Sequence, residues 1–70
     1  MKIKYDKETD VLYIQLSSLA VAESDQEKPG VIIDFAHNNQ IVGIEILNAS
    51  ANVDQVNGVL YEMTNGWYLD

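Results

Sequence analysis

The sequence predicts an α+β fold, a small antiparallel β-sheet built as a meander of hairpins with one short helix after Leu47. Two observations predict the sheet. Apolar residues alternate with polar ones over short runs, and turns rich in Asn, Asp and Gly separate these runs. A third observation, a cluster of helix-capping residues directly after Leu47, predicts the helix.

The most strongly patterned stretch is a hairpin from Gly30 to Leu47, in which two β-branched apolar runs flank the turn His37–Gln40. The predicted cross-strand pairs are Ala36–Ile41, Phe35–Val42, Ile33–Ile44 and Val31–Ile46. One face then forms the predicted core, which comprises Val31, Ile33, Phe35, Val42, Ile44 and Ile46. The opposite face is mixed, and it carries Ile32, Asp34, Ala36, Ile41, Gly43, Glu45 and Leu47.

Two strands are expected ahead of this hairpin, an edge strand over Lys2–Asp6 and a second strand over Val11–Leu16. A four-residue loop, Lys7–Asp10, keeps the apolar residues of both strands on one face. The predicted pairs are Tyr5–Leu12 and Ile3–Ile14.

Between these two hairpins the pattern is weaker. Val21 to Asp25 is predicted as a short strand. Pro29 and Gly30 then reverse the chain, because proline cannot donate to a β-ladder and belongs at the start or edge of a strand.

After Leu47 the sequence favours a helix. Residues Asn48–Asn52 offer several N-caps, and Asn52 with Gln55 forms a weak capping box. Gly58 is predicted to end the helix, since Asn-Gly favours a left-handed stop.

A terminal hairpin is predicted beyond Gly58. Val59–Thr64 and Trp67–Leu69 are its strands, and Asn65-Gly66 is its turn. The alternative is a single helix that continues to Met63, because Val53, Val56, Leu60 and Met63 share one helical stripe.

The size of the chain indicates one domain, residues 1–70, with a small core. Seventy residues with 47% hydrophobic content leave no room for a second domain. A core of this size supplies only about 3–5 kcal/mol. The sequence has no cysteine, so disulfides cannot add support, and we expect self-association as a homodimer or higher homo-oligomer.

Charge and hydropathy exclude nucleic acid as a direct ligand and a membrane-spanning segment. Eleven acidic residues against four basic ones give a net charge of −7, which repels the phosphates of nucleic acid. No apolar run is long enough to span a membrane, and the amino terminus lacks the apolar stretch of a signal peptide. The expected location is the cytoplasm.

Three segments of the chain resemble a known family. They are KIKYDKETDVLYIQL, PGVIIDF and IVGIEILNAS, and together they extend from Met1 to about Ser50. In this order they resemble Domain of Unknown Function family 2283, a group of short bacterial proteins. The resemblance implies a small antiparallel sheet and no assigned reaction. The chain departs from the pattern at Asn39, where members often have Gly.

Two carboxylates, Asp34 and Glu45, are the only candidates for catalysis. Asp34 pairs with Gly43 on the mixed face, which makes Glu45 its diagonal neighbour at about 7–8 Å. Carboxylates at this separation can serve glycoside hydrolysis, but a flat sheet gives no enclosed pocket for them. A small hydrolase is therefore the least favoured function, and the protein is more readily interpreted as non-enzymatic.

No cofactor or metal is expected. Asp6, Glu8 and Asp10 resemble the start of a calcium loop, but the positions that require Gly and Glu hold Val11 and Ser17. His37 is the single histidine and is expected to be an exposed turn residue.

The leading hypothesis is a protein-interaction module that self-associates through the mixed face or the terminal hairpin. Gly43 opposite Asp34 indicates a bulge or the close approach of another backbone, such as that of a partner subunit. The alternative is an acidic, antitoxin-like neutraliser of a basic partner protein. The predicted interface comprises Val11, Tyr13, Ile32, Ile41, Gly43, Leu47, Trp67 and Tyr68.

Overall fold

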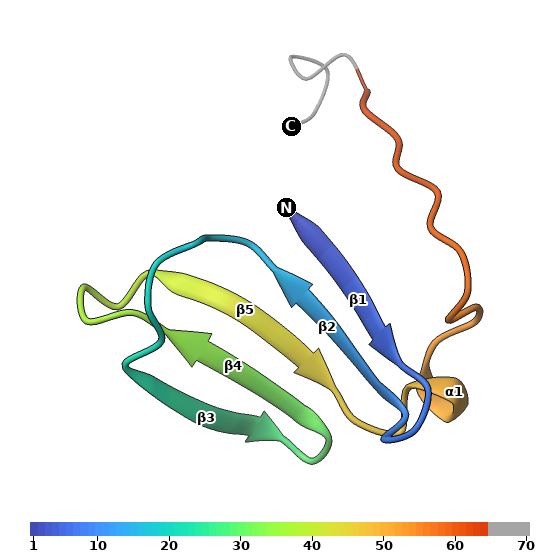
Figure 1. The fold of residues 1–70 in the computed structure, drawn as a ribbon, viewed down its shortest axis with the longest axis horizontal. Coiled ribbons are helices and arrows are strands. Elements are labelled where there is room, and N and C mark those ends of the chain that lie inside the picture. Colours follow the sequence, from blue (N-terminus) through green and yellow to red (C-terminus); the bar gives the residue numbers. More distant parts are fainter. Residues whose placement is uncertain (65–70) are drawn as a thin grey trace.

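A computed structural model of the chain describes residues 1–64. They form one antiparallel sheet and one helical turn (Figure 1). The elements are β1 (Lys2–Asp6), β2 (Val11–Gln15), β3 (Glu23–Lys28), β4 (Val31–Phe35), β5 (Ile41–Ile46) and α1 (Ala49–Asn52). The strand order is β1-β2-β5-β4-β3, so β5 is central and the hairpins β1–β2 and β3–β4 lie on either side of it.

The first hairpin has the predicted register. Tyr5 pairs with Leu12 and Ile3 pairs with Ile14, as the four-residue loop requires. Asp10 closes this loop with a positive φ of 57°, a conformation that Asp tolerates better than most residues. The alternation of apolar residues was therefore sufficient to fix this part of the sheet.

The central hairpin keeps its predicted register away from the turn and departs from it beside the turn. Val31–Ile46 and Ile33–Ile44 pair as expected, but Phe35 pairs with Ile41, and neither Phe35–Val42 nor Ala36–Ile41 forms. The N–H of Ala36 donates to the carbonyl of Gln40 at 2.9 Å, which leaves a three-residue loop that ends at Asn39 with φ 67°. Because such a loop is one residue longer than the two-residue form, a β-bulge follows it.

The third strand is displaced from its prediction. The sequence predicted Val21–Asp25, whereas β3 covers Glu23–Lys28. Lys28 pairs with Val31 across the two residues Pro29 and Gly30, so the tight turn decides where pairing begins. Every residue of β3 is exposed, which is why no apolar alternation marks it.

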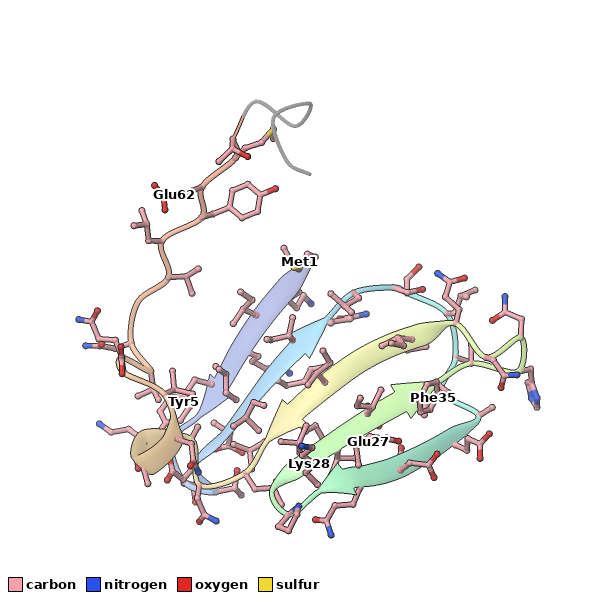
Figure 2. The ribbon with its side chains drawn as sticks, turned by 180° about the vertical axis from the view of Figure 1, so that it is seen from behind. Met1, Tyr5, Glu27, Lys28, Phe35 and Glu62 are labelled. Atoms are coloured by element: carbon pink, nitrogen blue, oxygen red, sulfur yellow. The ribbon has the colours of Figure 1, made fainter. Side chains whose placement is uncertain are left out.

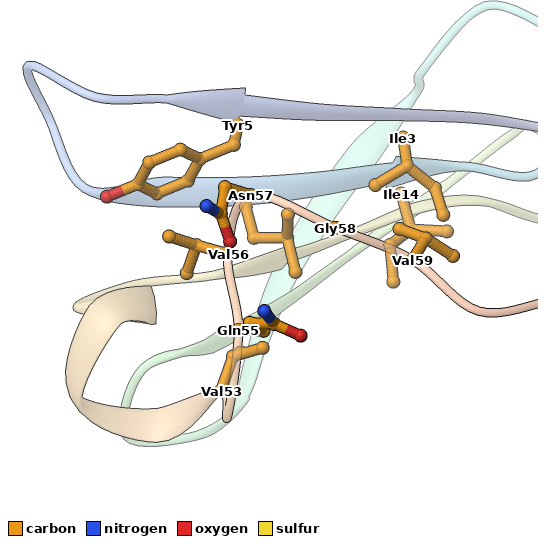
Figure 3. Close-up of a pocket in the computed structure, with 10 residues that line it drawn as sticks. Ile3, Tyr5, Ile14, Val53, Gln55, Val56, Asn57, Gly58 and Val59 are labelled. Carbon is orange, nitrogen blue, oxygen red and sulfur yellow. The ribbon is translucent and has the colours of Figure 1, made fainter.

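The helix starts within the predicted capping region, at the first of its N-caps, but is shorter than predicted. It covers Ala49–Asn52, follows a left-handed Asn48 and ends at the extended Val53. Neither a helix reaching Gly58 nor one reaching Met63 forms. Val53 and Val56 instead lie on a non-helical segment beside β1 and β2, with a turn at residues 56–57, and their side chains line a hollow together with the sheet (Figure 3).

The structure describes only the first part of the predicted terminal hairpin. Residues 59–64 are described, and none of them is in a strand. The predicted turn Asn65-Gly66 and the strand Trp67–Leu69 lie outside the described residues.

Among residues 1–64, no element forms a second layer over β4 and β5. In both views no ribbon covers the middle of these strands (Figures 1 and 2). Within residues 1–64 the buried apolar residues are Ala36, Val42 and Ala49, and no large side chain is fully buried. Of the predicted core only Val42 is buried, and the other members are half-buried: Val31, Ile33, Phe35, Ile44 and Ile46.

Candidate functional site

The mixed face contains a buried carboxylate, Asp34, which is 6% exposed. The hydroxyl of Ser24 on β3 donates to Oδ1 of Asp34 at 2.6 Å. Tyr13 reaches toward Asp34 from β2, across the central strand β5 at Gly43. We call Tyr13, Ser24, Asp34 and Gly43 the Asp34 cluster. It ties four strands together on one face.

The absent side chain of Gly43 makes this arrangement feasible. A Cβ at position 43 would lie 2.6 Å from Cζ and 2.8 Å from Cε1 of Tyr13. The close neighbour that the sequence indicated at Gly43 is therefore, within one chain, the ring of Tyr13. The ring covers Gly43 and helps to shield Asp34 from water.

The phenol of Tyr13 responds electrostatically to this environment. Burial raises the pKa of Tyr13 above 10.0, and the charge of Asp34, a hydrogen bond to it and the charge of Glu45 raise it further. Each of these effects disfavours a phenolate. Tyr13 is thus held in its neutral form, in which its hydroxyl can donate to the carboxylate.

Glu45 does not join Asp34 in a common hollow. The register makes the two residues diagonal neighbours, as predicted, because Asp34 pairs with Gly43 and Ile32 pairs with Glu45. The hollow beside Glu45 is lined by Lys4, Asp6, Thr9, Val11 and Tyr13, and Asp34 is not part of it. This hollow therefore does not bring together the two carboxylates considered for a hydrolase.

A second polar cluster joins the β1–β2 loop to the helix. The hydroxyl of Tyr5 donates to Oδ1 of Asp10 at 2.7 Å, and the hydroxyl of Ser50 donates to Oδ2 at 2.7 Å. The backbone N–H of Ser50 also donates to Oδ1, at 3.0 Å, and that of Ala49 donates to the Asp10 carbonyl at 2.9 Å. We call Tyr5, Asp10 and Ser50 the Asp10 latch.

The hydrogen bonds of the latch shift the pKa values of both titrating partners. Those from Tyr5 and then Ser50 lower the pKa of Asp10 below 3.8. The bond to Asp10 raises the pKa of Tyr5 above 10.0. Sequence analysis did not identify the latch, although Tyr5, Asp10 and Ser50 all lie in the segments that carry the family resemblance. Their spacing along the chain gives no sign that they meet.

The opposite face of the sheet is apolar. We call its half-buried aliphatic residues on β4 and β5 the open face, which comprises Val31, Ile33, Ile44 and Ile46, with Phe35 beside them on the same face. Over β1 and β2 the same face contacts residues 53–59, leaving a hollow of about 550 Å³ (Figure 3). The sheet side of this hollow is lined by Ile3, Tyr5, Leu12 and Ile14.

The residues of the predicted interface occupy different environments. Val11, Tyr13, Ile32 and Leu47 are half-buried, and Ile41 is exposed. Gly43 is buried beneath Tyr13. Trp67 and Tyr68 lie outside the described residues.

The remaining candidates are arranged as turn residues. His37 is exposed. In the predicted calcium-like loop, the side chain of Asp6 accepts a hydrogen bond from the N–H of Glu8 at 3.0 Å. Over residues 1–64, no three His, Cys, Asp or Glu side chains are grouped as metal ligands would be. No helix in this part of the chain has the length and apolarity needed to cross a membrane.

Comparison with known proteins supports the resemblance seen in the sequence. Residues 2–50 match the family model described as "Protein of unknown function (DUF2283)". Both polar clusters lie within this match, which ends at Ser50. Members were expected to be bacterial, whereas the relative described next is archaeal.

That relative is the "Uncharacterized protein MJ0789" of Methanocaldococcus jannaschii. It is 42% identical over 57 residues, which cover 79% of this chain and 48% of the relative. The chain therefore spans about half the length of this relative. No solved structure matches the chain.

Proposed function

Because this chain belongs to the family described as "Protein of unknown function (DUF2283)", whose description names no activity, we propose a function from its geometry. The protein is a non-catalytic interaction module that self-associates through the open face. One observation carries this proposal. Within the described part of the chain, nothing forms a second layer over β4 and β5 on the apolar side of the sheet. A sheet with one apolar face needs a partner layer to bury it.

The charge of one sheet edge supports a contact through a face. The β3 edge carries Glu23, Asp25 and Glu27 beside a single Lys28, all exposed. Two β3 edges would bring these acidic residues together if they paired. Symmetric association through the β3 edge is thus disfavoured.

The Asp34 cluster supports the open face over the mixed face as the contact surface. Tyr13 is engaged with Asp34, and its ring covers Gly43. A partner on the mixed face would have to accommodate this polar arrangement. The open face offers only aliphatic side chains, whose burial is favourable at about 25 cal/mol per Å².

Two adjacent residues provide the test. Ile33 and Ile32 are both half-buried on β4, and they lie on opposite faces. We expect Ile33→Thr to weaken self-association roughly tenfold, because the ethyl branch of a half-buried side chain is exchanged for a hydroxyl. The dissociation constant is measured by sedimentation equilibrium over micromolar concentrations.

Ile32→Thr is the matched control, since it makes the same change in the same strand. It should leave the dissociation constant within about twofold, with the β-sheet circular dichroism of both variants unchanged. A wild-type chain that stays monomeric at every concentration would refute the proposal. Weakening by Ile32→Thr alone would move the interface to the mixed face.

A further inference from the structure

A short apolar segment extends away from the sheet after residue 58. Within residues 59–63, which we call the arm, Val59 is 66%, Leu60 84%, Tyr61 69% and Met63 82% exposed. Figure 1 shows the arm running past the amino end of β1 and away from β4 and β5. Four neighbouring large apolar residues at this exposure form an unusual surface for a lone chain.

We propose that the arm of one copy lies on the open face of a second copy. This inference rests on the proposed self-association and names the segment that makes the contact. The segment that leads into the arm already uses the same side of the sheet. Val53, Val56 and Val59 line the hollow opposite Ile3 and Ile14 (Figure 3).

The arm begins on the apolar side of the sheet and is directed away from the open face of its own chain. To cover its own β4 and β5 it would have to turn back across the sheet, whereas its path leads outward (Figure 1). A second copy stacked on the apolar side would meet the arm between the two sheets. A reciprocal exchange then uses one arm and one open face from each copy and gives a closed dimer.

The contact area favours this arrangement over sheets alone. Five strands about 4.8 Å apart, each about 17 Å long, present a plane of about 400 Å² per face. Residues 53–59 already cover part of this plane. A stable interface needs about 800 Å² from each partner. The exposed side chains of the arm provide additional apolar area without unfolding any strand.

The chemistry of both surfaces identifies the occupant as a second copy. Four of the five arm residues are apolar, and the open face consists of aliphatic side chains. Glu62 is the single charged residue of the arm. Neither surface thus carries the basic or acidic cluster that would select a charged partner.

The first test compares two exposed leucines. Leu60→Ser removes an arm side chain, and Leu19→Ser removes one that is 44% exposed in the β2–β3 connection. We expect Leu60→Ser to raise the dissociation constant of the dimer roughly tenfold or more, because burial of a leucine is lost. Leu19→Ser should leave it within about twofold. Since both side chains are exposed in one chain, both variants should fold.

The second test locates the arm directly and exploits the absence of cysteine from the sequence. Tyr61→Cys carrying a nitroxide spin label is mixed with isotope-labelled wild-type chain that carries no spin label. We expect relaxation enhancement at the backbone amides of Val31, Ile33 and Ile44 of the isotope-labelled wild-type chain. Chemically reduced label provides the baseline.

The outcomes separate this inference from the proposed function. A wild type that never associates would overturn both. A dimer that Leu60→Ser leaves intact, with no relaxation enhancement in the mixed sample, would overturn the arm contact while self-association stands. In a second sample the spin-labelled chain itself carries the isotope label and is diluted with unlabelled wild type. Enhancement at β4 and β5 in that sample, with none in the first, would show that the arm covers its own sheet and would equally overturn the exchange.

Discussion

At the scale of single residues, Gly43 determines how the mixed face packs. Because position 43 has no side chain, the ring of Tyr13 crosses the central strand and approaches Asp34. The hydroxyl of Ser24, on β3, donates a hydrogen bond to the carboxylate of Asp34. The burial of a charged group in so small a protein is tolerable because hydrogen bonds compensate for lost hydration.

The first prediction concerns this contact. Gly43→Ala should lower the free energy of unfolding by about 1–3 kcal/mol, because a methyl group would overlap the Tyr13 ring and force it aside. For a domain of this size the midpoint of thermal unfolding falls by about 4–8 °C per kcal/mol. Denaturant titration followed by circular dichroism measures the change.

Gly58→Ala is the matched control, because nothing lies within 4 Å of a Cβ added there. Its stability should stay within about 0.5 kcal/mol of the wild type. In a Tyr13→Ala background the Gly43→Ala change should cost much less, since the obstructing ring is gone. An equal cost in both backgrounds would contradict the role given to Tyr13.

At the scale of elements, the Asp10 latch explains why a four-residue helix persists. A helix of one turn is unstable alone, since nucleation costs more than its few hydrogen bonds return. Asn48 makes no side-chain cap to α1. The helix is held by Asp10 instead. Its carboxylate accepts hydrogen bonds from the N–H and the hydroxyl of Ser50, and its backbone carbonyl accepts one from the N–H of Ala49.

The second prediction follows from the lowered pKa of Asp10. In the folded protein the pKa of Asp10 lies below 3.8. The charged carboxylate therefore contributes its full stabilisation at pH values above the pKa of the unfolded chain. This stabilisation is lost as the pH falls through the pKa of the folded protein. Asp10→Asn tolerates the positive φ and keeps one acceptor, yet it removes the charge. We expect a lower thermal midpoint at pH 7 and a difference from the wild type that shrinks below pH 3.8.

Thermal unfolding at a series of pH values from 7 to 2 checks this prediction. Asp25→Asn, at an exposed position of β3, serves as the control for removing a carboxylate. Other acids titrate in both proteins, so the difference between wild type and Asp10→Asn isolates the latch. A difference that is constant with pH would exclude a role for the charge.

At the scale of the whole molecule, the sheet remains a single layer. Domains are stable when two layers bury a common core, and the described residues provide only part of a second layer, over β1 and β2. No large side chain among residues 1–64 is fully buried. Folding and association should therefore be coupled.

The third prediction is that stability depends on protein concentration. If a second copy provides the missing layer, the thermal midpoint should rise as the concentration increases from micromolar to millimolar, because association stabilises the native state by mass action. Scanning calorimetry at several concentrations measures this. The Ile33→Thr variant should show a weaker dependence, and a midpoint independent of concentration in the wild type would contradict the coupling.

Local pattern in the sequence was enough to predict the first hairpin and the central hairpin away from its turn. The pairs Tyr5–Leu12 and Ile33–Ile44 follow from alternation and loop length, since a slip of one residue would turn every apolar side chain to the wrong face. The bulge between the pairs Asp34–Gly43 and Phe35–Ile41, and the position of β3, did not follow from it. Both depend on turn geometry, in one case a three-residue loop and in the other an immediate reversal at Pro29 and Gly30.

By itself the sequence determined which residues face the same side of the first hairpin and of the central hairpin away from its turn, that the family resemblance extends to about Ser50, and that Asp34 and Glu45 are diagonal neighbours. Only the tertiary structure decided that Tyr13 fills the space over Gly43, that Asp10 holds the helix, and that the arm leaves the sheet. The physical reason is separation along the chain. Alternation and turn preference act between near neighbours, whereas contacts such as that between Asp10 and Ser50 join residues 40 positions apart, and no local pattern records them.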